Sequence, residues 1–127
     1  MLRIAHLTDL HLPAEAGHAV AGRDADQALE SILSRVLALH PDLLLLTGDL
    51  ADAGDASAYL RLRHRLRPLN CPVLALPGNH DIGDADEPSQ PVDDTRRARW
   101  TERFGDLRWS RDAGDWLRWS GDSRRLH

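Results

Sequence analysis

The sequence contains no lysine and only one cysteine, Cys71. A lone cysteine cannot form a disulfide within the chain, and because Cys71 begins an apolar run we expect it to pack as a small hydrophobic side chain. The 16 basic residues are all arginine and are outnumbered by 20 acidic residues, which gives a net charge of −4. The absence of a polybasic tract argues against binding to nucleic acid or to an anionic membrane surface.

Long apolar segments are also absent. No stretch approaches the roughly 18 apolar residues of a membrane-spanning helix, and the N-terminus leads directly into a predicted strand without the apolar core of a signal peptide. We therefore expect a cytoplasmic protein without a membrane span. The length of 127 residues fits one compact domain, residues 1–127.

Apolar residues are spaced alternately as in strands and as in helices. Residues 2–7, 43–46 and 73–76 form short apolar runs that predict strands, and the continuous run 43–46 is typical of a central strand covered on both faces. Between these runs, apolar residues recur at helical spacing, namely Leu29, Ile32, Leu33, Val36 and Leu37, and then Tyr59, Leu62, Leu66 and Leu69. The predicted order is β-α-β-α-β, an α/β fold with a parallel sheet.

The predicted helices have recognisable ends. Asp24 or Asp26 can cap the first helix, and Pro68 should end the second near Arg67.

Beyond residue 85 the pattern weakens. We expect a polar loop over residues 83–91, a short arginine-rich helix over 92–104 and a further strand around 115–120. The sequence thus divides into a well-matched core, residues 1–85, and a poorly defined helix and tail, residues 86–127. Three tryptophans of the tail are interpreted as packing residues: Trp109, Trp116 and Trp119.

Polar motifs follow each of the three predicted strands. They are Asp9-Leu10-His11, Gly48-Asp49 and Gly78-Asn79-His80-Asp81. Open α/β sheets bind ligands outside the carboxyl ends of their strands, so we expect the three motifs to meet at one edge. Each motif taken singly is better explained as an ordinary turn or helix cap. Together they predict a metal site.

The residue types and spacing fit a site for two divalent metal ions. Asp9 and His11 lie two residues apart, so in extended backbone their side chains point the same way and can bind one ion. Asp49 carries two oxygens, which suits a carboxylate that bridges two cations about 3.5–4 Å apart. Asn79 adds a neutral oxygen for the second ion. This donor set favours Mn²⁺ or Fe, with Zn²⁺ as a further option, over Ca²⁺.

The motifs resemble those of the calcineurin-like metallophosphoesterases, most of all the small bacterial branch related to class III cyclic-nucleotide phosphodiesterases. The matching segments are residues 3–12, 41–52 and 72–81, within a resemblance that covers roughly residues 1–85. It implies the βαβαβ half of an αββα sandwich with the C-terminal half missing. It also implies hydrolysis of a small phosphoester, favouring a phosphodiester such as a cyclic nucleotide, by water activated between two metal ions.

The resemblance assigns roles to individual residues. His80 is expected to contact the phosphate and assist departure of the alkoxide, and Asp52 to orient His80. Asp81 is given a supporting role. Gly48 and Gly78 are expected to allow sharp turns that bring the backbone close to the ions.

Complete family members carry further histidines that this sequence does not match. They have one in a mid-chain segment and two in a Gly-His-x-His motif, whereas the only histidine after His80 is His127. We therefore expect a truncated chain with an exposed sheet face through which it can self-associate. Two alternatives stay open, a non-catalytic remnant and a half-site protein completed by another chain. Phosphomonoester and nucleic-acid cleavage also stay open as alternative reactions.

Other polar residues are interpreted as structural. We expect His6, inside the first strand, to be a hydrogen-bonded core or inter-sheet histidine. His18 and Arg23 are expected to be plain loop residues. The arginine-rich stretch 61–67 is expected to be a solvated helix face, because alternating positions fan around a helix.

Overall fold

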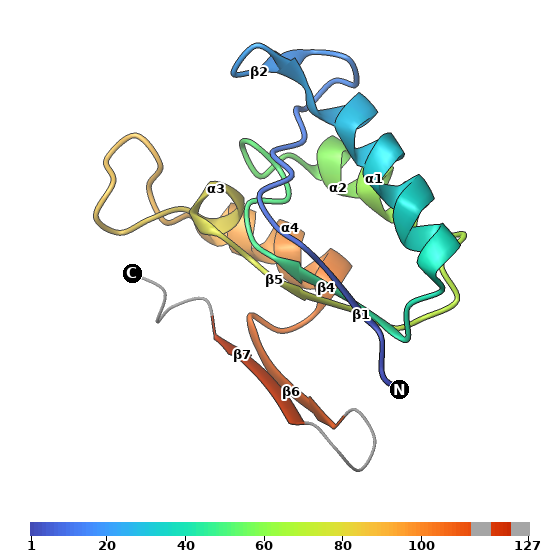
Figure 1. The fold of residues 1–127 in the computed structure, drawn as a ribbon. Coiled ribbons are helices and arrows are strands. Elements are labelled where there is room, and N and C mark those ends of the chain that lie inside the picture. The colour runs from blue at the N-terminus through green and yellow to red at the C-terminus, as the bar shows by residue number, and fades with distance from the viewer. Residues whose placement is uncertain (113–117, 123–127) are drawn as a thin grey trace.

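The computed structural model describes residues 1–112 and 118–122, with only the backbone for residues 108–112 and 118–122. A parallel sheet of three strands forms its centre (Figure 1). In sheet order the strands are β1 (Ile4–Leu7), β4 (Leu43–Thr47) and β5 (Val73–Leu76). Ile4 pairs with Leu43 and Leu44 with Val73, so the carboxyl ends of all three strands meet at one edge. The predicted α/β order is confirmed, although the first strand begins at Ile4 and not at Leu2.

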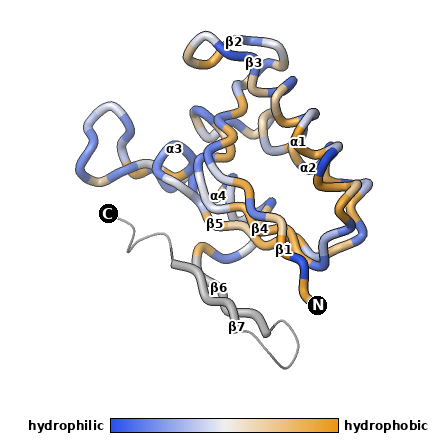
Figure 2. The backbone as a smooth tube through the Cα atoms, in the orientation of Figure 1, coloured by the Kyte–Doolittle hydropathy of each residue, from blue (hydrophilic) through white to orange (hydrophobic). Residues whose placement is uncertain are grey.

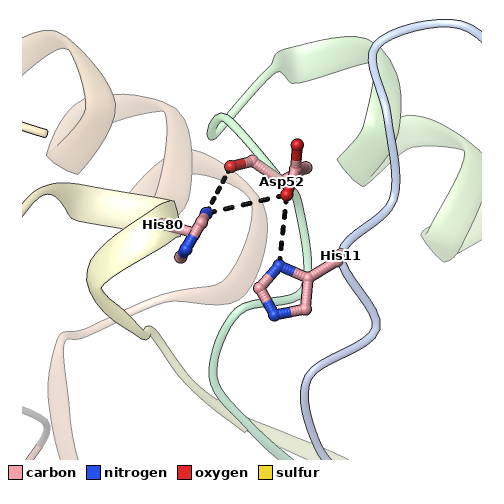
Figure 3. A group of neighbouring side chains, drawn as sticks. All are labelled: His11, Asp52 and His80. Atoms are coloured by element: carbon pink, nitrogen blue, oxygen red, sulfur yellow. Dashed lines mark hydrogen bonds and ion pairs between the residues drawn. The ribbon is translucent and has the colours of Figure 1, made fainter. Parts of the chain in front are cut away.

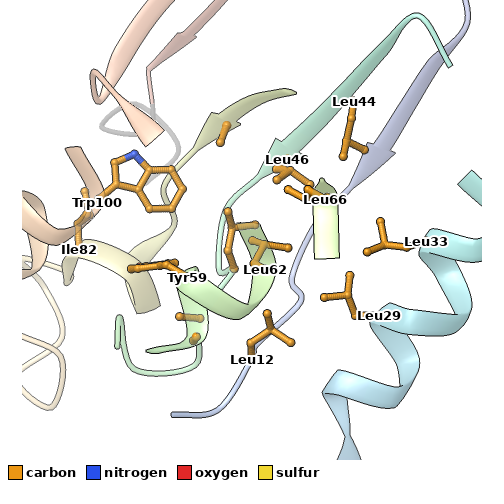
Figure 4. Close-up of a cluster of buried hydrophobic side chains, with 14 residues drawn as sticks. Leu12, Leu29, Leu33, Leu44, Leu46, Tyr59, Leu62, Leu66, Ile82 and Trp100 are labelled. Carbon is orange, nitrogen blue, oxygen red and sulfur yellow. The ribbon is translucent and has the colours of Figure 1, made fainter. Parts of the chain in front are cut away.

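Two helices connect these strands and cover one face of the sheet. They are α1 (Ala25–Leu39) and α2 (Ala56–Leu66). Their apolar stripes pack against β4 in one buried cluster (Figure 4), whose labelled members include Leu29, Leu33, Leu44, Leu46, Leu62 and Leu66. The cap of α1 is Asp24, whose carboxylate accepts a hydrogen bond from the Gln27 amide at 3.1 Å. Helix α2 ends at Leu66, two residues before Pro68 as predicted.

Two further helices follow β5. The short α3 (Asn79–Ile82) begins directly after Gly78, and α4 (Asp94–Phe104) is capped by Asp93. The intervening loop is largely hydrophilic in Figure 2, which agrees with the polar loop predicted there. Trp100 of α4 is fully buried and meets Tyr59 of α2 edge-to-face, with ring centroids 5.7 Å apart. Helix α4 therefore joins the same core as α1 and α2.

A small hairpin occupies the segment that was predicted as a plain loop. It consists of β2 (Ala19–Val20) and β3 (Arg23–Asp24). The two turn residues, Ala21 and Gly22, both have positive φ, 49° and 76°, as a type I′ turn requires. Sequence analysis missed this hairpin because two-residue strands are too short to show an alternating pattern.

A second hairpin lies in the tail. It pairs β6 (Arg108–Asp112) with β7 (Arg118–Asp122) in antiparallel register. The strand predicted around residues 115–120 agrees with β7 over residues 118–120, and residues 115–117 lie outside the described part of the chain. Trp116 and the side chains of Trp109 and Trp119 also lie outside it, so their packing stays a prediction.

The sheet face opposite the helices carries its own apolar cluster. Leu43, Leu45 and Leu74 form it and are buried. His6 lies on this face and is exposed, so it is not a core histidine, and the alternative of an inter-sheet histidine stays a prediction. Strand alternation turns His6 away from the helices, and its Nε2 lies 2.6 Å from the hydroxyl of Thr47.

Asp26 is a buried carboxylate, only 4% exposed, at the contact between α1 and α2. Its Oδ1 accepts hydrogen bonds from Arg61 Nε at 3.0 Å and from Arg65 Nη2 at 3.3 Å. Arg61 also donates to the backbone carbonyls of Pro13 and Ala14, in the loop after β1. The predicted solvated face is therefore wrong for Arg61 and Arg65, which turn toward α1.

Among the described helices, none has the length and apolar character that crossing a bilayer requires.

Replacing Asp26 by alanine should lower the free energy of unfolding by roughly 2 kcal/mol, because two arginines lose a buried anionic partner. The loss is limited because both guanidinium groups are partly exposed and water can solvate them. Urea unfolding measures the change. Glu30→Ala is the matched control, since the Glu30 side chain is 75% exposed and lies 3.9 Å from Arg65. Equal effects of the two substitutions would contradict a structural role for the Asp26 network.

Candidate functional site

The loops after β1 and β4 run side by side beyond the edge of the sheet. The Asp9 amide donates to the Gly48 carbonyl at 3.0 Å, and the His11 amide donates to the Asp49 carbonyl at 2.8 Å. The strand-like pairing thus continues past the last residues of the strands. It brings together the first two predicted motifs.

His11 lies at the centre of the side chains gathered there. Its Nε2 is 3.7 Å from Asp9 Oδ1 and 3.8 Å from Asp49 Oδ2. Its Nδ1 is 3.3 Å from Asp52 Oδ1. Two groups of potential metal ligands share this imidazole, Asp9 with Asp49 and Asp52 with His80, and within each group the donor atoms lie within 4.8 Å of one another.

The backbone conformation at this edge differs from the prediction. Asp9 and His11 were expected in extended backbone, but both lie in the left-handed region, with φ of 56° and 47°. Asp49 does the same, with φ of 51°. Asp and His tolerate this region better than most residues, yet it remains costly, and such strain collects at functional sites. The side chains converge through these turns and not through strand alternation.

Asp52 contacts two imidazoles by different atoms (Figure 3). His80 Nδ1 lies 2.6 Å from the backbone carbonyl of Asp52 and 3.7 Å from its carboxylate, whereas His11 Nδ1 lies 3.3 Å from that carboxylate. A hydrogen bond from Nδ1 to the carbonyl fixes the tautomer of His80 and leaves its Nε2 as an acceptor. The predicted contact between Asp52 and His80 therefore runs mainly through the backbone, and the carboxylate lies closer to His11.

Asn79 and His80 share a neighbour that sequence analysis missed. Asn79 Nδ2 donates to Gln90 Oε1 at 3.2 Å, and Gln90 Nε2 lies 3.4 Å from His80 Nε2. Among the described residues, no donor reaches the side-chain oxygen of Asn79, so this oxygen is available to a cation. Gln90 lies in the loop before α4, where no spacing pattern distinguishes it from its neighbours.

Asp81 is completely buried beneath the site. It accepts four hydrogen bonds, from the amides of Leu50 (3.2 Å), Ala51 (3.1 Å) and Gly78 (2.9 Å) and from the hydroxyl of Tyr59 (2.8 Å). Burial raises the pKa of Asp81, and the hydrogen bonds oppose that rise. Burial, together with the neighbouring Asp81 carboxylate, raises the pKa of Tyr59 far above its ordinary value. Sequence analysis missed Tyr59 because its spacing indicated only a core residue.

Gly48 and Gly78 bring two loops into backbone contact. A Cβ on Gly48 would lie 3.1 Å from the Cα of Gly78, and a Cβ on Gly78 would lie 2.5 Å from the Asp49 amide nitrogen. The same approach lets Asp49 Oδ1 accept a hydrogen bond from the His80 amide at 2.9 Å. Asp49 Oδ2 remains on the side of His11.

The donor set fits a divalent transition metal. Asp9, His11 and Asp49 combine two carboxylates with one imidazole, and the left-handed turns direct all three to one point. Carboxylate oxygen together with imidazole nitrogen suits Mn²⁺, Fe and Zn²⁺. A cavity of about 400 Å³, lined in part by Asp9, His11, Asp52 and His80, gives a ligand access to the same point.

The chain is similar to known proteins. The calcineurin-like phosphoesterase family model matches residues 2–124. A 3′,5′-cyclic-nucleotide phosphodiesterase of Nostoc sp. is 39% identical over 86 residues, which cover 66% of this chain and 32% of the relative. A 3′,5′-cyclic adenosine monophosphate phosphodiesterase of Pseudomonas aeruginosa is 39% identical over 80 residues, which cover 61% of this chain and 29% of the relative. The matched part thus spans less than a third of either relative.

A solved structure shares the fold. The purple acid phosphatase from yellow lupin seeds superimposes with a TM-score of 0.55 at 17% identity, and the match covers 87% of this chain and 22% of that one. At this level of identity the likeness concerns the fold alone.

Replacing Asp81 by asparagine should lower the free energy of unfolding by about 3 kcal/mol, because an amide NH₂ would face buried donors where an oxygen now accepts from them. Tyr59→Phe removes one hydroxyl donor and should cost only about 1 kcal/mol. Denaturant unfolding in EDTA measures both changes without a metal contribution. Asp86→Asn, in an exposed loop, is the control. A cost for Asp81→Asn no larger than for this control would contradict a structural role for the four hydrogen bonds that Asp81 accepts.

Proposed function

Because the chain belongs to the calcineurin-like phosphoesterase family, we propose that its sheet edge is part of a phosphodiesterase site for cyclic nucleotides. The observation that carries the proposal is the sharing of His11 by two groups of ligands, one built on Asp9 and Asp49 and the other on Asp52 and His80. The names of the relatives support the choice of substrate, since several are cyclic-nucleotide phosphodiesterases.

Four residues would hold two divalent cations, with Mn²⁺ or Fe proposed ahead of Zn²⁺. They are Asp9, His11, Asp49 and Asn79. When bound, such cations neutralise phosphate charge and lower the pKa of a shared water, which makes that water a nucleophile at neutral pH. Asp49 suits a position between the two cations because its carboxylate is held in place. One oxygen, Oδ1, accepts a hydrogen bond from the His80 amide, and the other, Oδ2, lies toward His11.

His80 is proposed as the group that contacts the phosphate and protonates the departing alkoxide. The carbonyl of Asp52 accepts the Nδ1 proton, so the Nε2 proton of a protonated ring is the one free to move. The carboxylate of Asp52 lies 3.7 Å from the same Nδ1. Asp52 is thus a positioning residue for both His80 and His11.

A cytoplasmic location and self-association through an exposed sheet face stay predictions.

The proposed reaction is tested with bis(p-nitrophenyl) phosphate. We expect Mn²⁺-dependent release of p-nitrophenol, abolished by EDTA and lowered about 10²-fold by His80→Ala, because the charge that develops on the phosphate loses a hydrogen-bond donor. His64→Ala is the matched control, since His64 is exposed on α2. Hydrolysis that persists in EDTA or is unchanged in His80→Ala would contradict the proposal.

A further inference from the structure

The cavity beside the candidate metal ligands has a second wall, made by the β2–β3 hairpin and the first turn of α1. Six residues form this hairpin wall: Val20, Ala21, Arg23, Asp24, Ala25 and Ala28. Four of them are small or apolar, Arg23 is a cation, and Asp24 is an anion whose carboxylate caps α1. The opposite wall holds the carboxylates and imidazoles of the proposed phosphodiesterase site. The cavity therefore has two different ends. At one end, carboxylates and imidazoles would hold cations that bind an anion, and the other end is largely apolar.

Arg23 makes no hydrogen bond or ion pair with any of the residues that the structure describes. Its sequence neighbour Asp24 is occupied as the cap of α1, where it accepts from the Gln27 amide. By contrast, Arg61 and Arg65 are bound to Asp26. A guanidinium that lines a cavity without a protein partner is available to a ligand, and its planar face stacks well on aromatic rings.

The hairpin turn holds this wall in a defined conformation. Val20 pairs with Arg23 across a two-residue turn, and Ala21 adopts a φ of 49° that alanine rarely takes. Backbone strain of this kind persists at ligand sites, where position matters more than local stability. The two-residue turn sets the register that pairs Val20 with Arg23 beside the cavity.

We propose that the hairpin wall binds the nucleobase of the substrate, with the guanidinium of Arg23 stacked on the ring. The inference rests on the proposed function, since the charged end must hold the phosphate. The apolar side chains of Val20, Ala21 and Ala28 then cover ring surface that would otherwise face water. The volume, about 400 Å³, falls in the range of small-molecule sites and admits a mononucleotide. Arg23 is accordingly a specificity-determining residue that favours nucleotide diesters over diesters without an aromatic group.

The test compares three ligands by calorimetry on the Mn²⁺-loaded full chain: inorganic phosphate, ribose 5-phosphate and 5′-AMP. For the unaltered chain we expect 5′-AMP to bind more tightly than ribose 5-phosphate. Arg23→Ala should weaken 5′-AMP about tenfold, a size typical of one stacked base, and leave phosphate within about twofold. Arg23→Lys should weaken 5′-AMP nearly as much, because lysine keeps the charge but lacks the planar face.

Arg35→Ala is the matched control, since Arg35 is an exposed arginine of α1 that does not line the cavity, and it should change none of the three affinities. Equal weakening of phosphate and 5′-AMP by Arg23→Ala, or full 5′-AMP affinity in Arg23→Lys, would overturn the stacking role. Equal affinities of the unaltered chain for 5′-AMP and ribose 5-phosphate would overturn base binding while leaving the proposed function intact. A chain that binds neither Mn²⁺ nor phosphate would overturn the proposed function, and this inference with it.

Discussion

The buried carboxylate of Asp81 joins the loop after β4 to the loop after β5. It accepts from the amides of Leu50 and Ala51 on one side, from Gly78 on the other, and from the hydroxyl of Tyr59 below. Separating the two loops would leave these donors unpaired in the protein interior, which is costly for each of them. Because Asp49 directly precedes Leu50 and His80 directly precedes Asp81, this single side chain sets the spacing between the proposed bridging carboxylate and the proposed general acid. The chemistry at the surface depends on that buried carboxylate.

Local spacing was enough to predict the three strands, the two crossover helices and the edge at which the polar motifs meet. It could not identify long-range partners. The apolar stripe of α2 marks Tyr59 as a core residue, but nothing in that stripe reveals a hydrogen bond to Asp81. Likewise, Asp24 and Asp26 are equivalent as cap candidates in the sequence, and only the packing of α2 on α1 separates the exposed cap from the buried partner of Arg61. The left-handed turns at Asp9 and His11 were missed because residue type permits them without requiring them.

The site divides into parts with different physical tasks. Carboxylates and imidazoles at the strand ends provide donors for cations, and the left-handed turns and close glycine contacts fix where those donors point. Asp52 fixes two rings, with its carbonyl toward His80 and its carboxylate toward His11. The hairpin wall adds apolar surface and a guanidinium without a partner among the described residues. A phosphate ester of a nucleoside has matching parts, an anion and a planar ring.

These loops are proposed to bind divalent cations through Asp49. The most direct test is a titration with Mn²⁺, followed by the electron paramagnetic resonance signal of the free ion, on the unaltered chain, Asp49→Asn and the control Asp55→Asn. Asp55 precedes α2 and makes no capping hydrogen bond through its side chain. The account predicts that Asp49→Asn abolishes Mn²⁺ binding and that Asp55→Asn retains it. Unchanged stoichiometry and affinity in folded Asp49→Asn would contradict the account.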